Sequence, residues 1–334
     1  MRLSSRHVRV LVVLPLLAAA AVALRPVEGR AQAPAAVAPV RTINHLQFRV
    51  TDPRKSFEFY MKLFGGRLID TSPNGWTMMV GETKQWLSFG KIPAGSTAKP
   101  GTLDHAGIGI DWPKEPAALR DALKAAFPAG KVQSPGQPTD STYNRSIYVS
   151  DPDGFSIQLI SKDDAGRLPR ADATPAASRT PAKGFLEFRG LNHLSLTVTN
   201  RENSRDFYAK LLGTTVRDQN RGQINVTLPG AGAVPGAGAW LSLLLANPQF
   251  PVPPGNLHHL GIGIDYPSDI PGIDALRKRI AAAFPEHKVY SPGEPSPSME
   301  ANYNRSIYII DPDGVSLQLV THKDDGWLAE ATKK

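Results

Sequence analysis

The chain has 334 residues, of which 41% are hydrophobic and 20% charged, and its formal net charge is +8. This length exceeds one typical compact core and predicts about two domains, while the composition excludes a disordered or collagen-like chain. No apolar run reaches the roughly 20 residues that cross a bilayer as a helix. Because the sequence contains no cysteine, disulfides and thiolate metal ligands are excluded. Any bound metal must use His, carboxylate or amide groups.

The first 33 residues have the order of a secretory signal peptide. Three arginines precede the apolar stretch from Val10 to Leu24, and small residues suited to cleavage follow up to Ala33. A short membrane anchor is the alternative, and Pro15 argues against it. We therefore expect residues 1–33 to be removed, leaving a periplasmic or secreted protein without a stable membrane anchor.

The basic charge is partly a property of this leader. It carries five arginines and one glutamate, so its removal lowers the formal charge from +8 to +4. The remaining basic residues are scattered and form no stripe that could follow a phosphate backbone. We therefore predict no nucleic-acid binding.

The rest of the sequence is a repeat. Four motifs of the first half return in the same order in the second half, with small insertions between them. The matching pairs are residues 44–46 and 192–194, 104–111 and 258–265, 143–148 and 303–308, and 151–154 and 311–314. This pattern predicts a first domain over 41–165 and a second over 185–325. The Ala-, Pro- and Thr-rich segment 166–184 between them reads as a linker.

Each copy divides again into two strand-helix-strand-strand-strand (βαβββ) units. In the first unit, Asp52 and Pro53 are typical of a helix start and Gly65-Gly66 of its end. The apolar face expected for this helix consists of Phe57, Tyr60, Met61 and Phe64, and short strands are expected at 67–70, 76–80 and 86–89. The four units are predicted over 41–92, 103–163, 190–246 and 257–323. The fold class is thus α+β, with each pair of units forming an open sheet barrel around a cavity.

Histidines stand in the opening strand of every unit. Side chains alternate between the two faces of a strand, so one histidine per unit can point into the shared cavity. The candidates are His45 and His105 in the first domain and His193 and His259 in the second. Gln158 and Gln318 occupy corresponding places in the closing strands. A divalent metal could take all three side chains of either domain, although packed histidines and a polar cavity lining are the alternatives.

These motifs resemble the vicinal-oxygen-chelate superfamily, which includes glyoxalases, bleomycin-resistance proteins and type I extradiol dioxygenases. The resemblance covers nearly all of residues 42–323. Resemblance to the extradiol enzymes implies that the two histidines of each domain are metal ligands. The third ligand of those enzymes is a Glu, at the position that Gln158 or Gln318 occupies here. The resemblance also implies that Tyr148 and Tyr308 occupy the place of an active-site tyrosine.

The sequence departs from the extradiol pattern in two respects. A neutral Gln replaces the Glu ligand in both copies, which leaves an Fe(II) site at about +2 rather than +1. The extradiol pattern expects a catalytic histidine shortly before Ile147-Tyr148 and Ile307-Tyr308, and neither copy has one. Glyoxalase-like relatives also carry a carboxylate in the last strand of the first unit, where Ser88 and Ser242 stand here.

Two further pairs have competing interpretations. Each copy has an Asp-Pro-Asp-Gly turn, at 151–154 and at 311–314. The simple hairpin register about this turn would place Tyr148 and Tyr308 on the face opposite the glutamines unless a bulge intervenes. Cross-strand packing is the alternative role of these tyrosines. Arg145 and Arg305 could bind an anionic substrate or pair with a carboxylate across the sheet.

The leading functional hypothesis is a metal-dependent enzyme resembling extradiol dioxygenases, which chelates vicinal oxygens of a small-molecule substrate. Fe(II) is favoured over Mn, Zn or Ni, and the metal may be absent. The alternatives are a glyoxalase-like lyase or isomerase and a non-catalytic small-molecule-binding protein of the same clan. A homodimer is possible, although these residues do not indicate one.

Overall fold

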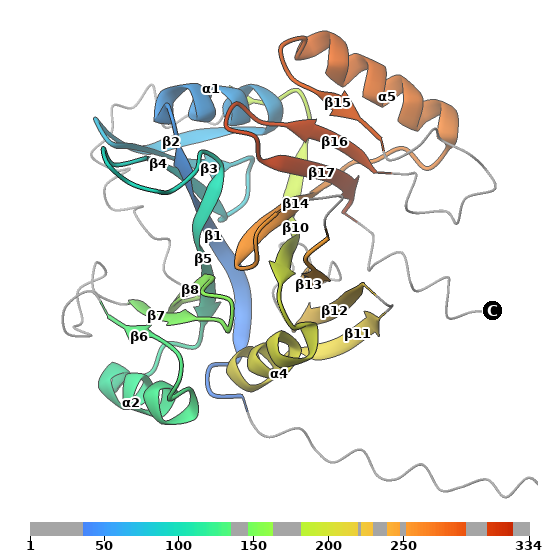
Figure 1. Ribbon diagram of the computed structural model, residues 1–334. Helices are drawn as coiled ribbons and strands as arrows, with labels where there is room; N and C mark the ends of the chain where they lie inside the picture. Colours follow the sequence, from blue (N-terminus) through green and yellow to red (C-terminus); the bar gives the residue numbers. More distant parts are fainter. Residues whose placement is uncertain are drawn as a thin grey trace, which may run out of the picture. The chain divides into compact units, whose positions relative to one another are not determined.

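The computed structural model describes residues 36–134, 146–162, 182–219, 222–229, 239–247, 252–291 and 306–322 (Figure 1). The expected signal peptide at 1–33 and most of the expected linker lie outside these ranges. In the described part of the chain, no helix is long and apolar enough to cross a membrane.

Helices and strands alternate in the order that the repeat predicts. The helices are α1 (Pro53–Phe64), α2 (Pro116–Ala126), α4 (Arg201–Leu212) and α5 (Ile270–Ala283). The strands of the first copy are β1 (Val40–Val50), β2 (Gly65–Ser72), β3 (Gly75–Val80), β4 (Trp86–Lys91), β5 (Thr102–Ile110), β6 (Val132–Gln133), β7 (Ser146–Ser150) and β8 (Ser156–Ser161), followed by the short β9 (Ala182–Lys183). The strands of the second copy are β10 (Phe188–Val198), β11 (Thr215–Gln219), β12 (Gln223–Leu228), β13 (Ala239–Leu245), β14 (Asn256–Ile264), β15 (Val289–Tyr290), β16 (Ile307–Ile310) and β17 (Ser316–Thr321).

Two open sheets carry these strands, one for each copy. In the described residues the first has the order β6-β7-β8-β5-β1-β4-β3-β2-β9 and the second β11-β12-β13-β10-β14-β17-β16-β15. Within each unit the opening strand pairs in parallel with the last, as β1 does with β4 and β5 with β8. The opening strands of two units, β1 and β5 or β10 and β14, then pair antiparallel. The predicted pairing of βαβββ units is therefore confirmed, and β9, within the expected linker, extends the first sheet.

Local sequence signals explain where α1 begins and ends. The side chain of Asp52 accepts hydrogen bonds from the backbone N–H groups of Arg54 and Lys55, and Pro53 needs no such partner. Gly65 ends the helix at φ 68°, a conformation that favours glycine, and the chain turns there into β2.

The buried face of α1 differs from the predicted one. Phe57 and Met61 are only half-buried, whereas Phe59 and Leu63, which we had not placed on the apolar face, are buried. The reason is that α1 packs on both its own sheet and the second copy, where the Phe59 ring lies 5.7 Å from that of Phe284. A helix pattern judged against one sheet cannot anticipate a second partner.

The two copies contact each other through matching pairs. Tyr60 on α1 donates a hydrogen bond to Asp311 of the second copy (3.0 Å), and Tyr208 on α4 donates one to Asp151 of the first (2.9 Å). Figure 1 shows α1 beside the closing strands β16 and β17. The Asp-Pro-Asp-Gly turns thus also join the copies, and one apolar core runs through both.

Candidate metal centre

Two histidines of the first copy face each other on adjacent strands. His45 on β1 and His105 on β5 are buried, and their Nε2 atoms lie 3.1 Å apart. Gly107 pairs with His45 across the strands, and a Cβ built on Gly107 would overlap the imidazole ring. The glycine therefore makes the space into which His45 turns. On its other side the ring stacks on Trp86, with centroids 3.6 Å apart.

Hydrogen bonds at the Nδ1 atoms determine which nitrogen of each ring carries the proton. Nδ1 of His45 lies 2.9 Å from Oδ1 of Asn44, and Nδ1 of His105 lies 3.0 Å from Oδ2 of Asp104. Carbonyl and carboxylate oxygens only accept, so both Nδ1 atoms carry the proton of the neutral ring. Both Nε2 atoms then present lone pairs to the space between the rings.

A β-bulge brings Asp104 to this side of the sheet. Gln47 pairs with His105 and Phe48 with Leu103, so Asp104 is an extra residue on β5. Arg49 donates to its carboxylate at 2.8 Å. Burial raises the pKa of Asp104, but hydrogen bonds and charge from His105 and Arg49 outweigh it, and the net result is a lowered pKa. Asp104 is therefore ionised at neutral pH and acts as an acceptor for His105.

Gln158 supplies the third candidate ligand. It lies on β8 and pairs with Gly107, so it stands in the same row as His45, with β5 between them. Its Oε1 atom is buried and has no hydrogen-bond partner among the described residues. A buried acceptor without a donor is costly unless a cation or a water molecule meets it.

The donor set fits a divalent ion. Two ring nitrogens bound to one ion at about 2.1 Å, at right angles, lie about 3 Å apart, which matches the separation of the two Nε2 atoms. In the described residues, no three His, Asp or Glu side chains gather into a metal site. Among the described residues, the amide oxygen of Gln158 is the candidate third ligand.

The second copy repeats the histidine pair. His193 and His259 have their Nε2 atoms 3.1 Å apart, and Nδ1 of His193 lies 2.8 Å from Oδ1 of Asn192. Burial lowers the pKa of His193 to about 3 and that of His259 well below its usual value. Both rings are therefore neutral at neutral pH, the form that binds metals.

The surroundings of the second pair differ from those of the first. His258 takes the bulge position of Asp104, and its Nδ1 lies 2.8 Å from Nδ1 of His259. The hydroxyl of Ser195 lies 2.8 Å from Nε2 of His259. Gln318 donates to Ser306 (2.6 Å). This hydrogen bond holds the amide of Gln318, and no corresponding bond is found for Gln158 among the described residues.

The register of the closing hairpin corrects one sequence expectation. Tyr148 pairs directly with Gln158 and Tyr308 with Gln318, so each tyrosine shares a face with its glutamine. The sequence expectation assumes a four-residue turn. In the structure, β7 ends at Ser150 and β8 begins opposite it at Ser156, so five residues lie between the strands. The Tyr148 ring accordingly meets His105 edge-on, with centroids 5.4 Å apart.

Other candidate residues have separate outcomes. Arg145 and Arg305 lie outside the described residues. Ser88 is buried and hydrogen-bonds to Thr77, and Ser242 donates to Asn225 (2.6 Å). Each serine thus hydrogen-bonds to a polar side chain of the neighbouring strand. Asp104 and the glycine opposite each histidine were missed. The repeated Gly-Ile-Gly after His105 and His259 was the available signal.

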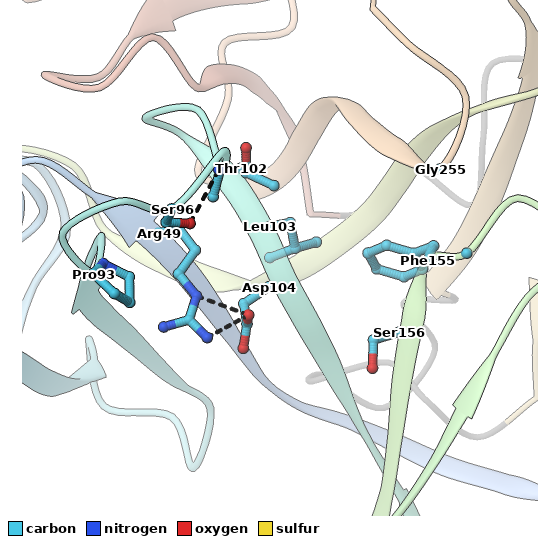
Figure 2. Close-up of a pocket in the computed structure, with 11 residues that line it drawn as sticks. Arg49, Pro93, Ser96, Thr102, Leu103, Asp104, Phe155, Ser156 and Gly255 are labelled. Atoms are coloured by element: carbon cyan, nitrogen blue, oxygen red, sulfur yellow. Dashed lines mark hydrogen bonds and ion pairs between the residues drawn. The ribbon is translucent and has the colours of Figure 1, made fainter. Parts of the chain in front are cut away.

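A pocket of about 340 Å³ opens beside the first centre (Figure 2). Asp104 and Arg49 form an ion pair in its lining, as Figure 2 shows, and Thr102, Ser156 and Phe155 line it further. A pocket of about 160 Å³ borders His258 in the second copy. In each copy a hollow thus reaches the residue that precedes the second histidine.

Paired βαβββ units, two to each open sheet, define the fold class of this chain. The family model described as Glyoxalase/Bleomycin resistance protein/Dioxygenase superfamily matches residues 42–159 and 190–319. The chain belongs to this superfamily, and each copy is one of its domains.

Among curated relatives, an iron-dependent extradiol dioxygenase of Rhodococcus jostii is 27% identical over 259 residues, covering 72% of this chain and 79% of that protein. A probable lactoylglutathione lyase of Vibrio parahaemolyticus is 30% identical over 135 residues, covering 37% of this chain and 92% of that protein. The chain is thus similar to both extradiol dioxygenases and glyoxalases.

Solved structures show the same fold. Homoprotocatechuate 2,3-dioxygenase from Arthrobacter globiformis has a TM-score of 0.57 at 18% identity, over 87% of this chain and 82% of that one. An Mn(II)-bound glyoxalase from Novosphingobium aromaticivorans has a TM-score of 0.59 at 17% identity, over 86% and 84%.

Proposed function

We propose that this protein is a metal-dependent enzyme that acts on a small molecule with vicinal oxygens, in the manner of extradiol dioxygenases. The observation that carries the proposal is the convergence of two Nε2 lone pairs, from His45 and His105, beside the unpartnered Oε1 of Gln158. Two imidazole nitrogens and an amide oxygen are atoms of the kind that bind a divalent cation.

The metal we propose is Fe(II), in preference to Mn, Zn or Ni. Imidazole nitrogens and an amide oxygen suit Fe(II), and the similar Rhodococcus jostii protein is named as iron-dependent. When bound, the ion acts as a Lewis acid and a template for two oxygens of the substrate. With three neutral ligands the site keeps a charge of about +2, which favours a dianionic chelating substrate.

The chain's own residues would orient this substrate. Trp86 fixes the His45 ring by stacking, and Asp104 fixes that of His105. The Tyr148 ring lies on the same face as Gln158, next to His105, where it can border a bound ligand. The neighbouring pocket has Arg49 and Asp104 in its lining, so a small molecule bound there would meet the residue that holds His105.

A glyoxalase-like lyase or isomerase is the second candidate, favoured by the 30% identity to the probable lactoylglutathione lyase. Such chemistry needs a redox-inert metal and a nearby base rather than oxygen.

Oxygen consumption separates the two. The protein, reconstituted with Fe(II) under anaerobic conditions, should consume oxygen when mixed with a series of catechols, and His105→Ala should abolish this. Absence of oxygen uptake together with turnover of a hemithioacetal by the Mn(II) form would favour the glyoxalase reaction. Failure of both assays in metal-loaded protein would contradict an enzymatic role.

We also propose that the protein is exported, on the sequence of residues 1–33. Mass spectrometry of the protein from the periplasm or medium should then show a chain that begins at Pro34. A protein that keeps its first residues and stays in the cytoplasm would contradict export.

A further inference from the structure

The two copies carry different residues immediately before the second histidine. Asp104 and His258 occupy the same bulge position, immediately before the second histidine of each copy. Each contacts Nδ1 of that histidine, at 3.0 Å and 2.8 Å respectively. The position therefore acts on the candidate ligand through its outer nitrogen.

In the first copy, the carboxylate of Asp104 allows one arrangement of the neutral ring. A carboxylate accepts and cannot donate, so Nδ1 of His105 must carry the proton and Nε2 must be a lone pair. Arg49 and Gln47 donate to the two oxygens of Asp104, at 2.8 Å and 3.2 Å, and hold the carboxylate in place. A lone pair at Nε2 is what a metal ion requires.

In the second copy the partner is an imidazole, which can donate or accept. When Nδ1 of His258 donates, Nδ1 of His259 accepts and the proton of His259 moves to Nε2. That proton then points at Nε2 of His193, 3.1 Å away, whose own proton is held at Nδ1 by Asn192. In that arrangement the pair is satisfied by an internal hydrogen bond and offers no vacant ligand position.

The third ligand follows the same division. Oε1 of Gln158 has no hydrogen-bond partner among the described residues, whereas the Gln318 amide is held by the hydrogen bond that it donates to Ser306 (2.6 Å). Ser195 further occupies Nε2 of His259 at 2.8 Å, and its counterpart in the first copy, Gln47, is turned to Asp104.

We infer that Asp104 is a positioning residue that makes the first domain the high-affinity metal site, and that His258 keeps the second domain a weak one. This inference rests on the proposed metal-dependent function and names the copy that carries it. Residues that hold a ligand histidine typically change metal affinity by 10- to 100-fold when they are replaced.

Co²⁺ titration of the full chain tests the inference, with bound metal measured by visible absorption and by equilibrium dialysis. The wild type should bind one equivalent tightly and a second more weakly. Asp104→Asn should weaken the tight site by roughly 10- to 100-fold, because the amide can donate to His105. His258→Asp should strengthen the weak site.

Matched variants assign the sites and control for charge. His105→Ala should remove the tight equivalent, and His259→Ala should leave it. Asp111→Asn removes an exposed carboxylate that directly follows the end of β5 and pairs with Arg41 and Lys162. It should leave both affinities unchanged. Circular dichroism and thermal unfolding of each variant verify that it is folded.

The outcomes separate the two claims. If folded wild-type protein binds no Co²⁺, the proposed metal-dependent function fails. If it binds Co²⁺ but the tight equivalent disappears in His259→Ala, or if Asp104→Asn binds as the wild type does, the function stands and the assignment to the first copy is wrong.

Discussion

Gly107 and Gly261 show how single residues shape the candidate centre. Each pairs with the first histidine of its copy, and a Cβ at either position would overlap the imidazole ring of His45 or His193. The histidines can lie across the neighbouring strand only because those positions have no side chain. The site thus depends on two residues without functional groups.

Replacing Gly107 with alanine should therefore disturb the site directly. We expect Gly107→Ala to destabilise the protein by about 1 to 3 kcal/mol through overpacking and to lower the metal stoichiometry, because the His45 ring must move. Urea unfolding and metal analysis measure the two effects. Gly75→Ala is the control, since a Cβ built on Gly75 would lie 3.4 Å from Phe89 O, an ordinary contact. Equal behaviour of the two variants would contradict this account.

At this scale the sequence pointed to the histidine pair and missed its partners. Alternation along each strand allowed His45, His105 and Gln158 to face one cavity, and the register sets His45 and Gln158 in one row, with His105 3.1 Å from His45. Alternation also assigns Asp104 to the face opposite His105, and the bulge reverses that. Bulges depend on pairing with the adjacent strand, which short-range pattern does not reveal.

Helix ends were the most predictable elements. Asp52, Pro53 and Gly65 mark the limits of α1 in the sequence, and the hydrogen bonds of Asp52 confirm its role. The N-cap residue of α2, Glu115, makes no such side-chain bond. The two helices therefore provide an internal comparison.

Asp52→Ala should lower the free energy of unfolding by about 1 kcal/mol, because two backbone N–H groups lose their acceptor. Glu115→Ala should change it by less than about 0.5 kcal/mol. Chemical denaturation of both variants measures the difference. A loss for Glu115→Ala as large as that for Asp52→Ala would show that capping is not the source.

Element faces that meet the other copy were not predictable from one repeat. Phe59 widens the buried face of α1 because Phe284 of the second copy packs against it, and Lys62 donates to Ala283 O at 2.6 Å. Sequence periodicity reports that a residue is apolar, but the partner that buries it comes from tertiary structure.

On the scale of the whole molecule, the two copies share a core and two buried Tyr-Asp hydrogen bonds. Burial raises the pKa of Asp311 to about 7 and that of Asp151 to about 6. An aspartate of the unfolded chain has a pKa of about 3.9, so the folded state holds the proton more tightly. The stability that each carboxyl contributes is present below about pH 4 and is lost as the pH rises through the folded pKa.

Asp311→Asn should consequently lose this pH dependence. We expect the variant to gain stability relative to the wild type as the pH rises from about 4 to 8, since the amide stays neutral. Thermal unfolding of both proteins across this range gives the difference. Asp121→Asn, an exposed carboxyl on α2, controls for the change in net charge. A difference that is constant with pH would contradict the raised pKa.

The repeat made the fold predictable at this scale. Four motifs in matching order indicated four βαβββ units in two domains, and the sheets follow that plan. The contacts between copies were not predictable, because Tyr60 and Asp311 lie 251 positions apart in the sequence. Tyr60 reads as part of the apolar face of its helix and Asp311 as a turn residue, so neither indicates the other.

The most direct test of the central claim is the metal content of the full chain after anaerobic reconstitution with Fe(II) and removal of excess ion. The account predicts at least one Fe per chain in the wild type and the loss of that ion in His105→Ala. A folded wild-type protein that retains no iron, or a His105→Ala variant that retains as much as the wild type, would contradict it.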